Sequence, residues 1–165
     1  MDFSNSWQNS LHLCLYTLLS ICSSLLLPSA SVTTHVSCLP DESSSLLQLK
    51  RDFFHSDLTS WQPGTDCCHG WEGVSCNETT GHVTALDISD RNIQGNLSAA
   101  IFNLTSLQYL NLAYNNFSQN QIPAHGFEKL TMLTYLNLSN TDFFGQIPIG
   151  IANLTNLISL DLSCH

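Results

Sequence analysis

Aliphatic residues recur through the second half of the chain with a long, regular period. Three segments share the pattern Leu-x-x-Leu-x-x-Leu-x-Leu and begin at Leu104, Leu130 and Leu154. A degenerate copy precedes them and begins at Val83. The central leucines of successive copies lie 24, 26 and 24 residues apart: Leu86, Leu110, Leu136 and Leu160.

This periodicity predicts a solenoid of stacked turns. In the Leu-x-Leu unit the two leucines point to one side of a short strand, and the intervening residue points to the other side. One turn alone cannot bury its leucines, but stacked turns form a parallel sheet with a continuous core. An amphipathic helix could use the same spacing, yet Pro123 and Pro148 interrupt any such helix. We therefore expect an α/β-type leucine-rich repeat fold with a curved parallel β-sheet.

A polar position in the turn after each strand varies between copies. Asn115 stands where repeats of this kind use an asparagine side chain to satisfy backbone groups of the turn. Arg91 and Thr141 occupy the matching places. We therefore expect the asparagine ladder to be broken in two of the readable turns.

The region before the repeats predicts a helical cap. Leu46, Leu49 and Phe53 recur at spacings of three and four, which is typical of one helical face. Asp41 and Glu42 lie near the start of this helix, where negative charge suits the helix dipole. Bulky side chains follow and complete a plug for the first turn of the solenoid: Phe54, Trp61 and Trp71.

The N-terminal segment predicts secretion. Residues 11–27 are strongly apolar and contain no Lys, Arg, Asp or Glu, and small residues follow them up to Ser31. This arrangement is typical of a cleaved signal peptide, assigned here to residues 1–31. An uncleaved membrane anchor is the alternative. Cleavage removes Cys14 and Cys22 and leaves five cysteines in an oxidising compartment.

Four of these cysteines are expected to form disulfides within the cap. Cys67 and Cys68 are adjacent, so a bridge between them would strain the intervening peptide. We favour Cys38–Cys67 with Cys68–Cys76, and Cys38–Cys68 with Cys67–Cys76 remains open. A zinc cluster of Cys67, Cys68, His69 and Cys76 is disfavoured, because secretory routing favours disulfides. A Cys/His nucleophile pair is disfavoured as well, because adjacency in sequence does not establish catalytic geometry. Cys164 is left as an odd thiol.

Composition excludes several classes of function. The chain has 4 Lys+Arg against 13 Asp+Glu, a formal net charge of -9, which argues against nucleic acid and against a basic membrane-surface helix. The seven His residues are scattered, and no nucleophile elbow or phosphate-binding loop is present. We therefore expect no enzyme activity, no cofactor and no metal.

The cap motifs resemble those of a known family. Residues 66–68 (Asp-Cys-Cys), 71–76 (Trp-Glu-Gly-Val-Ser-Cys) and 81–84 (Gly-His-Val-Thr) look like the plant-type N-terminal cap of extracellular leucine-rich repeat proteins. Residues 145–148, Gly-Gln-Ile-Pro, resemble the plant-specific 24-residue repeat class. The double cysteine is most similar to receptor-like proteins of the Cf and verticillium-wilt resistance types. The resemblance places the cap at 38–78 and the repeats at 82–165.

That resemblance implies a role in extracellular recognition. Such proteins are cell-surface immune or developmental receptors with many repeats, one membrane span and no kinase, and they signal through partner receptor kinases. The chain holds about three full turns and a truncated fourth, with no C-terminal cap or second apolar span. We therefore expect an apoplast-facing ectodomain portion, anchored at the plasma membrane only through a span in a longer form. Its expected ligand is an extracellular peptide or protein.

Three other interpretations remain open. The chain could be a short secreted interaction protein, of the cell-wall-enzyme inhibitor type or a decoy. It could be an ectodomain fragment of a receptor kinase. A pseudogene product without function is the third possibility.

The expected binding surface is the concave face of the sheet. Three columns of residues flank the leucines, and adjacent parallel strands should bring Tyr109 and Tyr135 side by side. A third column is expected at Ser89, Ala113, Ser139 and Ser163. The candidate binding residues are Asp87, Tyr109, Asn111, Tyr135 and Asp161. Ordinary solvent-side filling of the sheet is the alternative explanation for these residues.

Six Asn-x-Ser/Thr sequons are candidate glycosylation sites. They are Asn77, Asn96, Asn103, Asn116, Asn137 and Asn153. A glycan on Asn137 would lie on the concave face and obstruct binding there.

Overall fold

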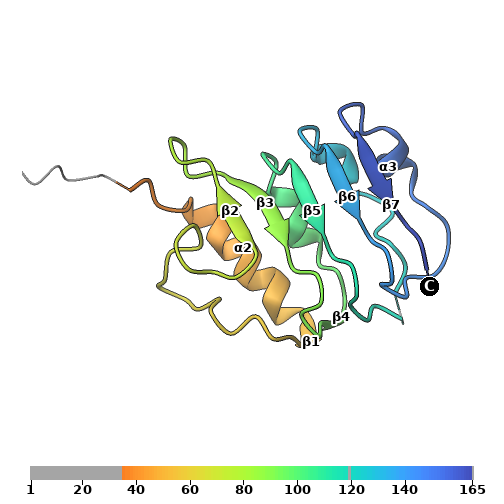
Figure 1. The fold of residues 1–165 in the computed structure, drawn as a ribbon, viewed down its shortest axis with the longest axis horizontal. Helices are drawn as coiled ribbons and strands as arrows, with labels where there is room; N and C mark the ends of the chain where they lie inside the picture. The colour runs from red at the N-terminus through yellow and green to blue at the C-terminus, as the bar shows by residue number, and fades with distance from the viewer. Residues whose placement is uncertain (1–34, 119, 165) are drawn as a thin grey trace, which may run out of the picture. The chain divides into compact units, whose positions relative to one another are not determined.

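The computed structural model describes residues 35–118 and 120–164 (Figure 1). The predicted signal peptide at 1–31, with Cys14 and Cys22, lies outside the described residues. Within the described part of the chain, no helix combines the length and apolar character needed to cross a bilayer.

A five-stranded sheet organises the repeats, in the order β2-β3-β5-β6-β7 (Figure 1). Strand β2 pairs antiparallel with β3, and every later pair is parallel. The strands are β2 (Val74–Cys76), β3 (Val83–Asp87), β5 (Tyr109–Asn111), β6 (Tyr135–Asn137) and β7 (Ser159–Asp161). The predicted solenoid with a parallel sheet is confirmed.

The sheet register follows the leucine period. Leu86 pairs with Leu110, Leu110 with Leu136, and Leu136 with Leu160. The first three leucines are fully buried, whereas Leu160 on the last strand is 44% exposed. Two adjacent copies are needed to cover each leucine, so burial is complete only between neighbouring turns.

Short helices cover the other side of the leucine core. They are two 3₁₀-helices and one single-turn α-helix: η1 (Ala99–Asn103), η2 (Phe127–Lys129) and α3 (Ile149–Ala152). Phe102 and Phe127 from the first two pack edge to face, with ring centroids 5.0 Å apart. Gly126 precedes η2 with φ +118°, and a Cβ at this position would collide with the Phe102 ring. A glycine therefore permits both the turn and the close packing of neighbouring coils.

The cap begins with helix α2 (Pro40–Arg51), and the next strand, β1 (Phe53–His55), pairs antiparallel with β4 (Gln94–Gly95) of the repeat region. Leu46 and Leu49 are fully buried on the helix, as predicted. The prediction that Phe53 continues the helical face is wrong, because this residue lies in β1 and pairs with Gly95. Phe54 was expected in the plug, but alternation along β1 turns it outward and leaves it 83% exposed.

A buried carboxylate joins the cap to the first strand of the repeats. Glu42 is 5% exposed. Its Oε2 accepts a hydrogen bond from the Val83 N–H at 2.6 Å, and its Oε1 lies 2.9 Å from His82 Nδ1. Its role extends beyond the predicted interaction with the helix dipole. Because Val83 is the first residue of β3, the carboxylate fixes the helix against the start of that strand.

Aromatic stacking and two disulfides close the rest of the cap. The rings of Trp61 and Trp71 stack with centroids 5.5 Å apart, and the Trp61 indole N–H donates to the Glu72 carbonyl. Of the two pairings left open by the sequence, the structure contains Cys38–Cys67 and Cys68–Cys76, each with a Cα–Cα separation of 5.5 Å. Cys164 is a free, exposed thiol.

Asn115 joins two successive coils, as its position in the repeat predicts. Its amide nitrogen donates to the carbonyls of Ile88 and Leu112, and its oxygen accepts from the N–H groups of Arg91 and Ile93. The matching Thr141 donates one hydrogen bond, to the carbonyl of Leu138. The asparagine therefore satisfies more buried backbone groups than the residue that replaces it.

Candidate functional site

Two tyrosines form the centre of the concave face. Tyr109 on β5 and Tyr135 on β6 are register partners, and their rings stack with centroids 4.4 Å apart at an interplanar angle of 3°. The predicted side-by-side arrangement is confirmed. Both side chains are half-buried, so the ring pair presents an aromatic surface that needs no rearrangement before contact with a ligand.

The side chains in the second column of the concave face form hydrogen bonds within the protein. Each side-chain oxygen accepts the backbone N–H two residues further on, at distances from 2.9 to 3.2 Å. These residues are Asp87, Asn111, Asn137 and Asp161. This Asx-type bond turns the chain after each strand, which explains why only Asp and Asn occupy the column. Asn111 and Asp161, proposed from the sequence as binding residues, therefore have a structural role of their own.

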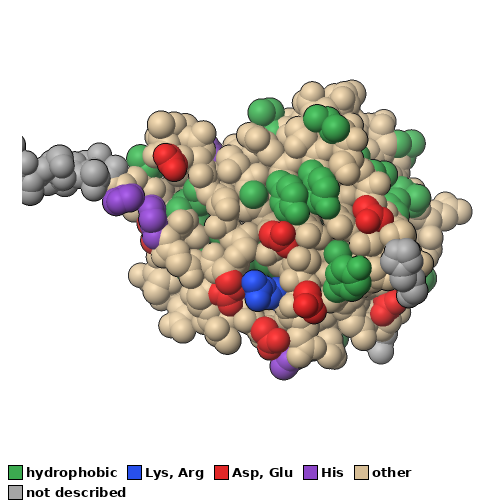
Figure 2. All heavy atoms as spheres, in the orientation of Figure 1, with side chains coloured by type: hydrophobic (Ala, Val, Ile, Leu, Met, Phe, Trp, Pro, Cys, Tyr) green, Lys and Arg blue, Asp and Glu red, His purple; other side chains and the backbone are tan. Residues whose placement is uncertain are grey.

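Polar contacts tie the two columns together. The Tyr109 hydroxyl donates to Asp87 Oδ2 at 3.4 Å, and the Asn137 amide donates to the Tyr135 hydroxyl at 3.3 Å. Burial, together with the negative charge of Asp87 and the neighbouring Tyr135, raises the pKa of Tyr109 above its ordinary value of 10.0. The tyrosine therefore stays neutral at physiological pH. Acidic side chains are spread over the face in Figure 2, and apolar side chains gather near its middle.

The third column expected on this face is not a continuous surface. Ala113 and Ser139 are buried, with 1% and 4% exposure, while Ser89 is half-buried and Ser163 is exposed. The chain turns inward after β5 and β6, which removes the first two side chains from solvent. Two columns, rather than three, remain for contact with a partner.

The sequons differ in accessibility. Five of the six asparagines are exposed: Asn77, Asn96, Asn103, Asn116 and Asn153. Asn137 is half-buried, and both its amide groups are engaged, with Tyr135 and with Ser139. A glycan there would require the concave network to open.

Sulfur atoms cluster in the cap without offering thiolate ligands. The Sγ atoms of Cys38, Cys67 and Cys68 lie within 4.8 Å of one another. All three belong to disulfides, and a metal ligand must be a thiolate. The cluster is therefore explained by the two crosslinks of the cap.

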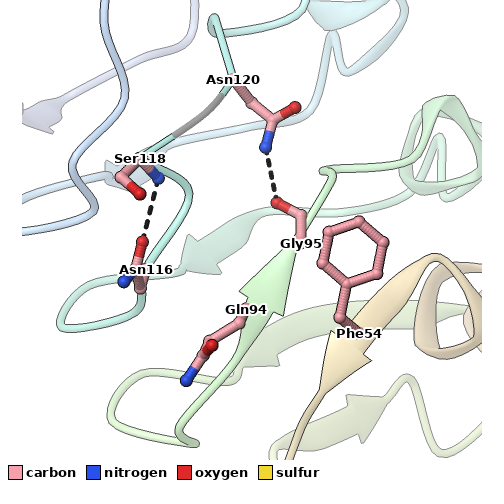
Figure 3. A pocket seen from close by; sticks show the side chains of 6 residues that line it. All are labelled: Phe54, Gln94, Gly95, Asn116, Ser118 and Asn120. Carbon is pink, nitrogen blue, oxygen red and sulfur yellow. Dashed lines mark hydrogen bonds between the residues drawn. The ribbon is translucent and has the colours of Figure 1, made fainter.

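Sequence reasoning missed a small pocket beside β4 (Figure 3). Its volume is about 150 Å³, and its lining comes from β1, β4 and the loop that follows Asn115. The lining residues are Phe54, Gln94, Gly95, Asn116, Ser118 and Asn120. The available signal was the adjacency of Phe53 and Phe54, since only one of two successive strand residues can face the core.

Together these features define a leucine-rich repeat solenoid with a disulfide-bonded cap and a concave face of aromatic and amide side chains. The family described as "Leucine rich repeat N-terminal domain" matches residues 39–77, and "Leucine rich repeat" matches residues 81–143. The chain belongs to the plant extracellular leucine-rich repeat proteins. This finding confirms the resemblance drawn from the cap motifs.

The relatives that this chain matches include plant receptor-like proteins and receptor ectodomains. Receptor-like protein 6 of Arabidopsis thaliana is 40% identical over 151 residues, which cover 79% of this chain and 15% of the relative. The chain thus spans about one seventh of that protein's length. The crystal structure of the BIR2 ectodomain from Arabidopsis thaliana is 30% identical, with a TM-score of 0.68, and the match covers 74% of this chain and 67% of that one.

A further solved relative contains a bound peptide. The Arabidopsis receptor kinase HAESA ectodomain, in complex with an extended IDA peptide hormone ligand, is 32% identical with a TM-score of 0.62. The match covers 74% of this chain and 20% of that chain.

Proposed function

We propose that this chain is the N-terminal ectodomain portion of a plant receptor-like protein and that its concave face binds an extracellular peptide or protein. The stacked pair of Tyr109 and Tyr135 carries the proposal. Two preformed aromatic rings, bordered by amide and carboxylate groups, are suited to anchoring a peptide side chain by binding alone, with no chemical reaction. Support also comes from Receptor-like protein 6 and from the peptide-bound ectodomain of HAESA.

The proposal includes location, organisation and partners. We assign residues 1–31 to a secretory signal, 38–78 to the cap and 82–165 to the repeats. The ectodomain faces the apoplast, and a longer form reaches the plasma membrane through a downstream span. That form signals through a partner receptor kinase and has no catalytic role of its own.

The first test asks whether the chain is part of a longer receptor. The native transcript is sequenced through and beyond the codon for His165. We expect the reading frame to continue into further repeats and an apolar span of about 20 residues. A stop codon directly after His165 would contradict assignment to a receptor and favour a short secreted protein.

The second test locates the binding face. A photoreactive phenylalanine analogue replaces Tyr109 in the full chain, which is secreted from plant cells into extracellular fluid. The matched control carries the analogue at Met132, a 49% exposed residue outside the concave columns. We expect a crosslinked extracellular peptide or protein only from position 109. Equal crosslinking from both positions, or none from position 109, would overturn the assignment of the face.

A further inference from the structure

The pocket beside β4 has the composition of a neutral ligand site. None of the described residues that line it carries a charged side chain, although the chain as a whole has a formal net charge of -9. Its volume of about 150 Å³ is below the roughly 300–1,000 Å³ of sites for drug-sized ligands. The site is therefore suited to one small, uncharged unit.

An exposed ring forms the apolar wall of this pocket. Phe54 is 83% exposed, the second-highest exposure among the large hydrophobic side chains of the described residues. Pairing of β1 with β4 holds its backbone, and a Cβ at Gly95 would lie 2.9 Å from the Phe54 backbone nitrogen. Glycine at position 95 therefore lets the two strands approach and brings the ring beside the pocket (Figure 3).

Amide and hydroxyl groups form the rest of the lining. Asn120 donates its amide to the Gly95 carbonyl at 2.8 Å, and Asn116 accepts from the Ser118 N–H at 3.0 Å, which fixes both side chains (Figure 3). Among the described residues, no hydrogen bond engages the Gln94 amide, Asn116 Nδ2 or the Ser118 hydroxyl. The pocket thus offers uncommitted donors and acceptors beside an aromatic face.

We propose that this pocket binds a neutral sugar ring, stacked on Phe54. A pyranose has an apolar face of C–H groups and a rim of hydroxyls, which match the ring and the amide groups respectively. Two sources of the sugar are consistent with this chemistry. One is a soluble saccharide, and the other is the chain's own N-glycan, because Asn116 lines the pocket and Asn96 directly follows Gly95.

The soluble source is tested on the full chain produced in a bacterial host that forms disulfides but adds no N-glycan, so that Asn116 is retained and no glycan occupies the pocket. Cellobiose and N,N′-diacetylchitobiose are titrated and followed by saturation-transfer NMR. We expect binding that weakens about tenfold in Phe54→Ala and is retained in Phe54→Trp. Phe144→Ala is the matched control, because that ring is 52% exposed and lies outside the pocket.

The chain's own glycan is tested on the glycosylated protein. Release by peptide-N-glycosidase is timed at Asn96 and Asn116, with Asn153 as the reference. A glycan held in the pocket should be released about tenfold faster in Phe54→Ala, with no change at Asn153. That result supports the proposal and assigns the sugar to the chain itself.

Two results would overturn the sugar site. One is the absence of saccharide binding together with glycan release that does not depend on Phe54. The other is saccharide binding that Phe54→Ala and Phe144→Ala reduce equally, with thermal unfolding showing both variants folded. Neither result bears on the concave face, which different residues form.

Discussion

The cap and the repeats bury their interiors in different ways. In the repeats, one leucine position recurs in register from strand to strand, and each turn is covered by its neighbours. In the cap, contacts join residues far apart in sequence, such as Glu42 with Val83 and Cys38 with Cys67. In the repeats the same leucine contact is therefore made again in each turn, whereas each cap contact occurs once.

A large effect on the cap is expected from loss of the longer disulfide. Replacing Cys38 and Cys67 together by Ala removes a crosslink between residues 29 apart. From the loop-closure entropy of the unfolded chain, the free energy of unfolding should fall by about 3.6 kcal/mol. The equivalent change at Cys68 and Cys76, 8 apart, should cost about 2.5 kcal/mol. Urea unfolding of the secreted chain measures both. Cys164→Ser is the control and should leave unfolding unchanged.

Equal losses from the two disulfide variants would contradict the view that the cap depends on its long-range contacts. In that case each crosslink would act mainly through local geometry rather than by restricting the unfolded chain.

A second change breaks the repeat core. Leu110→Ala removes a fully buried side chain and should lower the free energy of unfolding by about 2–5 kcal/mol. Leu160 occupies the same register position but is 44% exposed. Leu160→Ala should therefore lower the free energy of unfolding by less than about 1.5 kcal/mol. The comparison uses thermal or urea unfolding. Similar losses of unfolding free energy at both positions would show that the stability contributed by a leucine does not depend on a neighbouring turn on each side.

These two regions also differ in how much of them the sequence predicts. The register of the sheet followed from the positions of Leu86, Leu110 and Leu136, because a repeated pattern states its own alignment. The aromatic stack on the concave face followed from the same register. Whether that stack binds a ligand is still a prediction, since the spacing of residues places side chains and does not identify partners.

In the cap, the contacts that the sequence did not predict join residues that lie far apart along the chain. Phe53 fitted a helical face and Phe54 was expected in the plug. Pairing of β1 with β4, whose residues lie about 40 positions later, decided the environment of both. Glu42 suited a helix start, and nothing local indicated its bond to Val83. The pocket beside β4 was missed for the same reason, because its walls come from three separate segments.

A smaller effect is expected from the polar link between coils. Asn115→Ala leaves buried carbonyl and N–H groups of two turns without their partner and should cost about 2–3 kcal/mol. Thr141→Ala removes one hydrogen bond and should cost about 1 kcal/mol. Hydrogen exchange at Ile93 should quicken in Asn115→Ala only. Unchanged exchange there would mean that the asparagine does not join the two coils.

Acid should weaken the cap through Asp66. Partial burial acts to raise the pKa of this carboxyl, but hydrogen bonds from the Cys38 N–H, the His69 ring and the Cys68 N–H lower it overall below 3.8. Its contribution is therefore present above pH 3.8 and is lost as the pH falls through the lower folded value. In Asp66→Asn, the decline of unfolding free energy below pH 4 should be shallower. Identical acid profiles for the two proteins would remove Asp66 from the account.

Alkali should act on the repeats instead, and with the smallest effect. The raised pKa of Tyr109 means that the folded chain holds this proton more tightly than the unfolded chain, so the associated stability is full below pH 10.0 and declines as the pH rises through the folded value. Asp87→Asn removes the nearby negative charge and should lower that pKa. Phenolate absorbance, taken as the difference between each protein and its Tyr109→Phe variant, isolates the titration. An unchanged midpoint in Asp87→Asn would show that burial and Tyr135 alone raise the pKa, and that the two columns of the concave face are not electrostatically coupled.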